Sequence, residues 1–587
     1  KQGEFYGAVF QDSDVAKWLE AVAYTLAEKP DKELKKLADS VIELIGRAQE
    51  PDGYFNTYFI LKEPGQRFRN LREGHELYTL GHMIEAAVAY KRATGEKRFL
   101  EIVQKMADLV ANTFGVEEGK RMGMPGHQEI ELALMKLYEE TGKESYKELA
   151  KYFIDVRGCG NRNYFLEEMK QKDVKRIFPE LNDYRPEYSQ SHLPVRKQRT
   201  AEGHAVRAVY MYAAMADIAA EYDDEELLGA CETLWNNMVH RRMYVTGGIG
   251  SSGILERFTA DYDLPNDYNY CESCASIGLA FFARRMMQIT KKAKYVEVME
   301  RALYNTVLAG IAMDGKSFFY VNPLEVWPPS CMERTSKEHV KSVRQKWFGV
   351  ACCPANISRT LASLGEYIYA CEKDTIYVNL FIGNETQITV GEQKVHLSLE
   401  TDFPWKNQFK INVSGVKESV QLAVRIPEYA QDYKIFCEGR EQFYKEKDGY
   451  AYITCEKNGR YEVQFVSEPR FVRANPKVRA DEGKVCVMWG PLVYTVEETD
   501  NGENLQALYI DTAKPVKKSE KEEFPMLIAA GKRICESGWG EEELYGSHPL
   551  EFAETEITLV PYAYWGNREN GEMAVWLKEY LSDRNNK

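Results

Sequence analysis

The sequence lacks two features, a membrane-length apolar run and an excess of positive charge. No uninterrupted apolar stretch approaches the roughly 18 residues that a membrane-spanning helix needs. The chain carries 90 acidic and 76 basic residues, for a net charge of −14. This balance argues against a nucleic-acid partner, because phosphates would be repelled. We therefore expect neither a membrane nor a nucleic acid among its partners.

Secretion signals and a disulfide framework are also missing. No signal peptide is visible, although the chain begins at Lys1 without a methionine and is compatible with a missing N-terminal segment. The 12 cysteines are scattered along 587 residues and form no dense small-domain framework. Scattered cysteines are typical of reduced thiols, and we expect a bacterial cytoplasmic protein.

A nucleotide site lacks its signature as well. Residues 247–253 are glycine-rich like a phosphate loop, but no Gly-Lys-Ser/Thr ending and no preceding buried strand accompany them. The same loop leads to Glu256, sixteen residues before Glu272. Such a loop can bring a carboxylate over a cavity, where burial would raise its pKa into the range of a general acid. The alternative is an exposed loop glutamate.

Two cysteine-containing stretches, residues 271–274 and 352–354, lie about eighty residues apart. Adjacent cysteines pair poorly with each other in a disulfide, but their sulfurs can converge on one ion. Thiolates and a carboxylate are suitable ligands for Zn²⁺. The simplest metal site uses Glu272, Cys274, Cys352 and Cys353. Cys271 is left out, and an irregular helix start is needed because Glu272 and Cys274 would diverge on a regular helix. Small buried thiols without a metal are the alternative.

The length predicts two or three domains, and the first 370 residues have the apolar period of helices. Asp12 or Ser13 is expected to cap a first helix. After Pro30-Asp31, a second helix is expected to place Leu34, Leu37, Val41 and Leu44 on its apolar face. Similar pairs of amphipathic helices recur, for example residues 75–93 with 99–113 and 276–289 with 295–308.

Alternate helices begin with a polar or metal-capable cluster. Five such starts are Gly74-His75-Glu76, Gly126-His127-Gln128, Gly203-His204-Ala205, Cys271-Glu272-Ser273 and Cys352-Cys353-Pro354. Regular helix pairs of this kind predict an (α/α)6 barrel whose inner helices begin around a common mouth, where their N-termini would favour thiolate and carboxylate. The alternative is that each histidine packs locally.

The pattern changes to short strands near residue 371. Apolar or alternating segments at 375–381, 395–399, 409–413, 422–426 and 450–453 predict a β-sandwich over residues 371–470. A second β-rich or β-sandwich domain is expected over residues 471–587, with strands near 485–488 and 492–494. The Lys/Glu-rich stretch 514–524 is expected to be an exposed loop.

Together these motifs resemble those of glycoside hydrolase family 127, the β-L-arabinofuranosidase family once labelled as a domain of unknown function. The segments that carry the resemblance are 247–250 with Glu256, 272–276, 351–356, 12–21, 75–78, 126–131, 319–324 and 574–577. They extend across nearly the whole chain, and their combination is specific whereas each alone is weak.

The resemblance implies a retaining exo-glycosidase that releases terminal β-L-arabinofuranosyl residues from plant-type glycans. It implies an (α/α)6 catalytic barrel over residues 1–370, followed by the β-sandwich domains. Family motifs place a Zn²⁺ ion on Glu272, Cys274, Cys352 and Cys353, the nucleophile on Cys352 and the acid/base on Glu256. Substrate contacts fall on His75, His127, His204 and Tyr320.

Two departures and three alternatives accompany this assignment. Cys271 is an extra thiol beside the ligands, and an N-terminal segment that helps to line the family's site is not visible. One alternative is a sugar epimerase whose histidines transfer protons, and another is a glycan-binding protein with structural zinc. A third is a glycosidase for a different pentose-like sugar of pectin. The expected partner is a carbohydrate, and a homodimer is left open.

Overall fold

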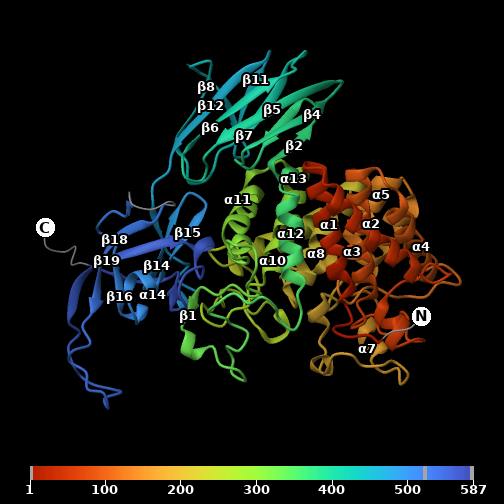
Figure 1. The fold of residues 1–587 in the computed structure, drawn as a ribbon, viewed down its shortest axis with the longest axis horizontal. Helices are drawn as coiled ribbons and strands as arrows, with labels where there is room; N and C mark the ends of the chain where they lie inside the picture. The colour runs from red at the N-terminus through yellow and green to blue at the C-terminus, as the bar shows by residue number, and fades with distance from the viewer. Residues whose placement is uncertain (1–3, 520–524, 582–587) are drawn as a thin grey trace.

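The computed structural model describes residues 4–519 and 525–581. A helical part comes first in the chain, and two β-rich parts follow it (Figure 1). The first β-rich part lies above the ends of α11 and α13 in this view, and the C-terminal one lies beside β1 at the left. The expected order, helices first and β-rich domains after them, is confirmed.

Six helices of the helical part contact one another in a cycle. They are α1 (Asp12–Glu28), α3 (Glu76–Thr94), α5 (Ile130–Thr141), α8 (Ala205–Glu221), α10 (Ser273–Thr290) and α12 (Cys352–Ala362). Each helix contacts the next, and α12 contacts α1 again. A second set packs outside them, namely α2 (Lys32–Ala48), α4 (Arg98–Thr113), α6 (Glu144–Val156), α9 (Glu225–Arg241) and α11 (Ala293–Ala302).

Burial separates the two sets of helices. Helix α8 is buried on every side over most of its length, as expected for a helix enclosed by others. Helix α2 contacts α1 and α4 and buries Ala38 and Ile42. The predicted second helix is present, but Leu37 and Leu44 of its apolar face are 51% and 56% exposed. The contact face of this outer helix is narrower than its apolar stripe.

The first two helices begin differently. The predicted cap by Asp12 or Ser13 was wrong, because Gln11 occupies the N-cap position of α1 without a side-chain hydrogen bond. The Asp12 carboxylate instead accepts hydrogen bonds from the backbone N and the Oγ1 of Thr57, at 2.8 and 2.7 Å. Asp31 does cap α2, since its Oδ1 accepts from the amides of Glu33 and Leu34 at 2.9 and 3.0 Å.

The middle part consists of two sheets that share one apolar core. One sheet has the order β10 (Lys445–Lys447), β11 (Tyr450–Cys455), β7 (Val420–Arg425), β3 (Thr375–Val378) and β2 (Tyr369–Glu372). The other has the order β4 (Asn384–Val390), β5 (Gln393–Thr401), β6 (Gln408–Ser414), β12 (Gly459–Val466), β8 (Gln431–Cys437) and β9 (Arg440–Glu441). Alternate residues of β5 and β12 point into this core, as the pattern at 395–399 predicted for β5.

The C-terminal part is one ten-stranded sheet. Its strands are β13 (Arg470–Val472), β14 (Lys484–Trp489), β15 (Leu492–Glu497), β16 (Leu508–Asp511), β17 (Lys517–Lys518), β18 (Leu527–Ile534), β19 (Phe552–Pro561), β20 (Met573–Ala574), β21 (Leu577–Tyr580) and β1 (Glu325–Val326). Pairing of β14 with β15 closes part of the sheet on itself. Strand β1, from the helical part of the chain, pairs with β20 and so anchors the two parts together.

Two expectations concern the surface. The predicted loop at 514–524 contains exposed strand β17, and residues 520–524 lie outside the described residues. Among the residues that the structure describes, no helix is both long and apolar enough to cross a membrane.

The cap of α2 is open to a direct test. Asp31→Ala removes the acceptor for two amides, so the first turn of α2 should lose about 1 kcal/mol of stability. Amides of that turn should exchange about fivefold faster with deuterium, measured by mass spectrometry on peptides that cover the helix. Asp31→Asn keeps an acceptor oxygen and should exchange like the parent. Unchanged exchange in Asp31→Ala would mean that packing alone holds this turn.

Candidate active site

A cavity of about 550 Å³ opens where the inner helices α3, α8, α10 and α12 begin. Its lining includes Phe10, His75, Tyr78, His127, Phe178, Tyr188, His204, Arg207, Tyr210, Glu256, Glu272, Cys274, Tyr320 and Cys352. Every residue predicted for the site except Cys353 lines it, and Cys353 lies just behind Cys352 and Cys274.

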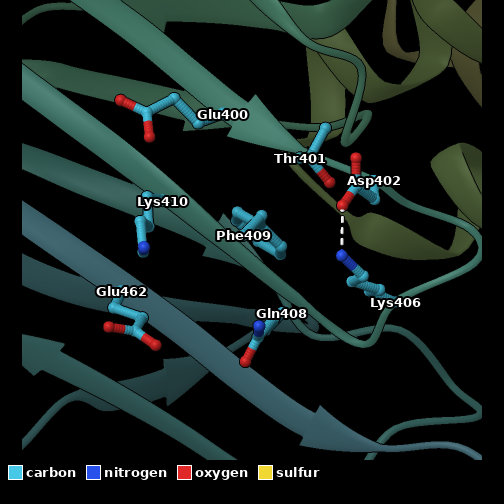
Figure 2. A pocket seen from close by; sticks show the side chains of 8 residues that line it. All are labelled: Glu400, Thr401, Asp402, Lys406, Gln408, Phe409, Lys410 and Glu462. Carbon is cyan, nitrogen blue, oxygen red and sulfur yellow. Dashed lines mark hydrogen bonds and ion pairs between the residues drawn. The ribbon is translucent and has the colours of Figure 1, made fainter.

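A second hollow lies on the middle part of the chain, between β5, β6 and β12 (Figure 2). Charged side chains dominate it, with an ion pair of 2.6 Å between Lys406 and Asp402. Its one aromatic residue, Phe409, is 2% exposed and offers no ring for stacking against a ligand. No cysteine or histidine lines this hollow, so we place the chemistry at the mouth of the helices.

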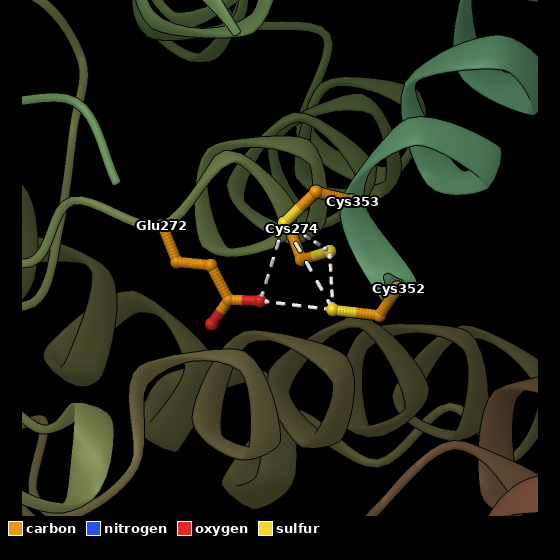
Figure 3. Close-up of side chains that lie close together, drawn as sticks. All are labelled: Glu272, Cys274, Cys352 and Cys353. Atoms are coloured by element: carbon orange, nitrogen blue, oxygen red, sulfur yellow. Dashed lines mark hydrogen bonds between the residues drawn. The ribbon is translucent and has the colours of Figure 1, made fainter. Parts of the chain in front are cut away.

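Three sulfurs and one carboxylate oxygen come together in the cavity (Figure 3). The sulfur of Cys274 lies 3.6 Å from both the Cys352 and the Cys353 sulfurs, which are 3.9 Å apart. Oε1 of Glu272 lies 3.4 Å from the Cys352 sulfur and 3.7 Å from that of Cys353. Ligands of a tetrahedral zinc would be about 3.8 Å apart for two sulfurs and about 3.6 Å for sulfur and oxygen. The four residues therefore fit a metal ion of this type.

The helix starts explain how these four residues meet. Glu272 is the N-cap residue of α10, with extended φ and ψ of −58° and 137°, and it forms a β-bridge with Val321. Its side chain can therefore lie beside that of Cys274 in the first helical turn, through the irregular start that the sequence required. Cys352 and Cys353 open α12, which contacts α10.

Cys271 stands apart from the cluster. It has a left-handed φ of 41°, and its sulfur accepts a hydrogen bond from Asn269 Nδ2 at 3.3 Å. It packs in a different apolar cluster, together with Tyr244 and Phe319.

The thiols of the cluster cannot all ionise by themselves. Hydrogen bonding with Cys274 raises the pKa of Cys352 well above its usual value, and burial does so for Cys353. Burial also opposes ionisation of Cys274, but hydrogen bonds from the other two thiols outweigh it and lower its pKa to about 6. Burial and mutual hydrogen bonding therefore disfavour three thiolates at once, and a cation bound among the sulfurs would favour them.

Tyr320 adds a polar contact to one of these sulfurs. Its hydroxyl lies 2.9 Å from the Cys352 sulfur, and its carbonyl accepts a hydrogen bond from the Ser273 amide at 3.2 Å. The segment that carries Tyr320 is thereby fixed beside the start of α10. A phenol in this position can donate to a thiolate at Cys352.

The three predicted histidines form a row along the wall of the cavity. Ring centroids of His75 and His127 are 5.6 Å apart, and those of His127 and His204 are 5.4 Å apart. Burial lowers the pKa of all three, to about 3 for His75. Nδ1 of His75 lies 2.6 Å from the Glu73 carbonyl and Nδ1 of His127 lies 2.8 Å from that of Gln128. Both rings therefore carry their proton on Nδ1, which leaves Nε2 as an acceptor.

Glycines before two of these histidines explain the repeated Gly-His pair. A Cβ on Gly126 would lie 2.3 Å from the Arg72 carbonyl oxygen. Gly203 has a φ of +70°, and a Cβ there would lie 1.9 Å from the backbone carbonyl oxygen of Glu187. Any larger residue would displace the histidine that follows.

Glu256 reaches the same cavity from the glycine-rich loop. Both Leu255 and Glu256 have left-handed φ values, of 60° and 53°. Oε2 of Glu256 lies 2.6 Å from His204 Nε2, and Oε1 accepts from the Tyr270 hydroxyl at 2.8 Å. Burial alone would raise the pKa of Glu256, but these hydrogen bonds outweigh it and the pKa lies below its usual value. This differs from the predicted rise, because the sequence did not reveal the two donors.

Two residues that sequence reasoning missed, Tyr270 and Arg207, contact the predicted site residues directly. Tyr270 lies two residues before Glu272, but Cys271 between them has a left-handed φ of 41°, so no regular strand or helix spacing marked Tyr270. Arg207 is 2% exposed and follows His204 by one helical turn. Its Nη1 donates to the Gly126 carbonyl at 2.7 Å. The positive charge of Arg207 is the second cause, after burial, of the lowered pKa values of His75 and His127. Only the spacing of Arg207 from His204 was readable in the sequence.

The neutral state of His75 should appear in the pH dependence of stability. Its pKa is about 3 in the folded protein against 6.5 ordinarily, so acid favours the unfolded chain, which binds the proton. The stability that His75 contributes is complete above pH 6.5 and is lost as the pH falls towards 3. Relative to His75→Gln, the parent should lose about 1.4 kcal/mol of unfolding free energy per pH unit in this window. Urea unfolding of both proteins at several pH values measures it, and parallel curves would contradict it.

Comparisons with known proteins cover nearly the whole chain. Family descriptions match residues 1–366 as "Beta-L-arabinofuranosidase, GH127 catalytic domain", 375–467 as the GH127 middle domain and 469–578 as the glycoside hydrolase family 127 C-terminal domain. A "Non-reducing end beta-L-arabinofuranosidase" of Bifidobacterium longum subsp. longum is 40% identical, covering 98% of this chain and 90% of that protein.

Solved structures agree with this assignment. A GH127 β-L-arabinofuranosidase from Geobacillus stearothermophilus T6 is 48% identical, with a TM-score of 0.95, covering 99% of this chain and 92% of that one. Another structure, described as a GH127 β-arabinofuranosidase, is 36% identical with a TM-score of 0.87, covering 99% and 90%. The chain therefore belongs to glycoside hydrolase family 127 and is an enzyme that acts on a carbohydrate.

Proposed function

We propose that this enzyme hydrolyses terminal β-L-arabinofuranosyl residues of plant-type glycans, with retention of the anomeric configuration. The observation that carries the proposal is that the Cys352 thiol and the Glu256 carboxylate line the same cavity. Most glycosidases have a pair of carboxyl groups in these two roles. An oxygen of Glu256 lies within 4.8 Å of one of Glu272, and Glu272 lies 3.4 Å from the Cys352 sulfur. Similarity to enzymes named β-L-arabinofuranosidase supports the choice of sugar.

The four cluster residues would hold one Zn²⁺ ion, in keeping with their distances and donor types. When bound, zinc would keep the thiols ionised at neutral pH and stabilise sulfur as it leaves carbon. Glu272 is wholly buried, and burial raises its pKa well above the usual value. The ionised form of a carboxyl group buried in this way requires a positive partner, and this requirement supports a cation at the centre of the cluster.

The nucleophile in this proposal is Cys352, the ligand that lines the cavity beside Tyr320. Its sulfur forms a bond to C1 of the sugar while the bond from C1 to the leaving oxygen breaks. The Tyr320 hydroxyl orients the sulfur by a hydrogen bond. In the second step water forms a bond to C1, the carbon–sulfur bond breaks, and the sugar leaves with its original configuration.

Glu256 would transfer the protons. It gives a proton to the leaving oxygen in the first step and takes one from water in the second. The free carboxyl is ionised, so it must gain a proton as the sugar enters. Entry of the sugar removes water from Glu256, and this loss of hydration raises the pKa of the carboxyl group. A sugar hydroxyl can then replace Glu256 as the hydrogen-bond partner of His204.

The neutral histidines support recognition of hydroxyl groups. Nε2 of His75 and His127 are acceptors, and a sugar lacking the matching hydroxyl would leave them buried and unpaired. Proton transfer in an epimerase needs a group with a pKa near neutrality, and a pKa of about 3 at His75 does not provide one. Family membership likewise favours hydrolysis over epimerisation or simple glycan binding.

We further propose that residues 1–370 form an (α/α)6 barrel, supported by the cycle of contacts from α1 to α12 and by the second set of helices outside it. Residues 371–470 and 471–587 would be separate β domains, the first a sandwich.

A substrate screen tests the function. Aryl β-L-arabinofuranoside, the α-anomer and several pectin-derived glycans would be assayed with the same sample. Release of L-arabinose from the β-anomer alone is expected. Turnover of a different pentose-like glycoside in its place would overturn the choice of sugar, and interconversion of free sugars without hydrolysis would overturn the reaction.

Metal content is the first prediction from this function. Protein purified without added metal should contain about one zinc per chain by elemental analysis, because the cluster offers one set of four ligands. Cys274→Ser should lower the zinc content, whereas Cys271→Ser should not, since its thiol lies outside the cluster. Fully active enzyme with no zinc would contradict the site.

The proton donor can be separated from other roles by the leaving group. Glu256→Gln should lower kcat/KM by roughly 10²–10⁴-fold on alkyl glycosides. The loss should be smaller on nitrophenyl glycosides, whose leaving oxygen needs little protonation. Glu338→Gln, at the rim of the same cavity, is the matched control and should remain near the parent. An equal loss on both substrates would remove Glu256 from this role.

Covalent labelling can identify the nucleophile, because loss of any ligand could also lose the metal. An electrophilic arabinofuranose analogue, such as an epoxide or haloacetamide, should modify Cys352, and peptide mass spectrometry locates the adduct. Free L-arabinose should suppress labelling by competing for the site. A zinc chelator should also suppress it, since an unliganded thiol regains its proton. Exposed Cys371 is the control thiol, which simple iodoacetamide should modify and the sugar analogue should not. An adduct on Cys353 or on a carboxylate would refute the assignment.

A further inference from the structure

Glu256 stands on a short loop whose backbone does not favour its conformation. Leu255 and Glu256 have left-handed φ values of 60° and 53°, which cost free energy for residues other than glycine. Two hydrogen bonds of 3.1 Å between the backbones of Ser252 and Arg257 close the base of the loop, and Ile254 near its tip is 78% exposed. The Glu256 carboxylate therefore depends on the contacts of its own side chain for its place in the cavity.

Each oxygen of this carboxylate is bonded by one side chain. His204 Nε2 lies 2.6 Å from Oε2 of Glu256. The backbone amide of Arg207 donates to His204 Nδ1 at 3.4 Å, so the ring proton is on Nε2 and Nε2 is the donor. The Tyr270 hydroxyl donates to Oε1 at 2.8 Å. The carboxylate is thus held between the N-cap residue of α8 and the segment that precedes α10.

The backbone of Tyr270 is fixed on both sides. Its amide donates to the Gly250 carbonyl at 3.2 Å, and its carbonyl accepts from the Asn322 amide at 3.3 Å. Gly250 belongs to the glycine-rich stretch that leads to Glu256, and Asn322 lies two residues after Tyr320. Tyr270 therefore connects the loop that carries the carboxylate to the segment that carries Tyr320.

We propose that Tyr270 is a positioning residue that holds Glu256 in place for proton transfer to and from the sugar. Tyr270 is 8% exposed and is not one of the residues that line the cavity, so its hydroxyl acts on the reaction through Glu256. In the proposed reaction a sugar hydroxyl becomes the partner of His204, and the hydrogen bond from Tyr270 is then the one that stays on the carboxyl group. This inference rests on the proposed role of Glu256.

Tyr429 provides a matched control. Its hydroxyl donates to Oε2 of Glu300 at 3.0 Å, and Tyr429 and Glu300 are 9% and 1% exposed. This is the same contact between a phenol and a carboxylate, buried to a similar degree, between the middle β-rich part and α11. Neither residue lines the cavity. Tyr429→Phe therefore removes an equivalent hydrogen bond without reaching Glu256.

The leaving group and a double substitution test the proposal. Tyr270→Phe keeps the ring and removes the hydroxyl, and Glu256→Ala removes the carboxylate that the hydroxyl bonds. These two variants, their combination and Tyr429→Phe would be assayed as full-length proteins on alkyl and nitrophenyl β-L-arabinofuranosides, with kcat and KM measured separately. Thermal unfolding checks that each variant folds.

We expect Tyr270→Phe to lower kcat/KM on the alkyl glycoside by roughly 10–100-fold. The loss should appear in kcat with KM near the parent, because Tyr270 does not touch the sugar. It should be smaller on the nitrophenyl glycoside, whose leaving oxygen needs little protonation. In the Glu256→Ala background, loss of the hydroxyl should change nothing further, since its partner is already gone. Tyr429→Phe should match the parent on both substrates.

Parent-like activity of Tyr270→Phe on the alkyl glycoside would overturn the proposal. An equal loss on both substrates, the same loss again in the Glu256→Ala background, or an equal loss in Tyr429→Phe would also overturn it, because each indicates a merely structural effect. If Tyr270→Phe does not fold, Tyr270→Leu, which also lacks the hydroxyl, takes its place in the same comparison. If Glu256→Ala itself loses activity equally on both substrates, the proposed role of Glu256 fails and this inference fails with it, which separates the two failures.

Discussion

The structure depends on holding three sulfurs and a carboxylate, which repel one another when ionised, within 3.4 to 3.9 Å of their neighbours. No local segment can do this, because two of the residues lie about eighty positions from the others. The helical part brings the four residues together because the starts of α10 and α12 lie side by side. An extended N-cap residue, Glu272, then brings its carboxylate to the sulfurs.

The charges of the side chains that line the cavity are also set by their neighbours. Burial and the charge of Arg207 keep the histidines neutral, so the wall of the cavity presents hydrogen-bond acceptors without adding positive charge. Glu256 is kept ionised by two donors, His204 and Tyr270. The cavity thus holds a carboxylate that can accept a proton close to the thiol cluster, since an oxygen of Glu256 lies within 4.8 Å of one of Glu272. The proposed function uses a thiol of the cluster to attack the sugar and Glu256 to transfer the proton.

The β-rich parts support the helices at a distance from the cavity. Arg425 joins the middle part to α11 through two buried glutamates, and β1 enters the C-terminal sheet by pairing with β20. Strand β1 follows Tyr320 by only a few residues. Pairing of this strand therefore restrains the segment that carries the tyrosine next to Cys352.

The sequence by itself determined the helical and β-rich parts, the family and the set of four metal-capable residues. These rest on local period, composition and short motifs, which are properties of neighbouring residues. Tertiary structure alone decided that Asp12 bonds to Thr57 instead of capping its helix, and that Leu37 and Leu44 face solvent. It also decided that the pKa of Glu256 falls, since His204 and Tyr270 reach it only in the folded chain. Contacts between distant residues set burial and hydrogen-bond partners, and these have no signature in local pattern.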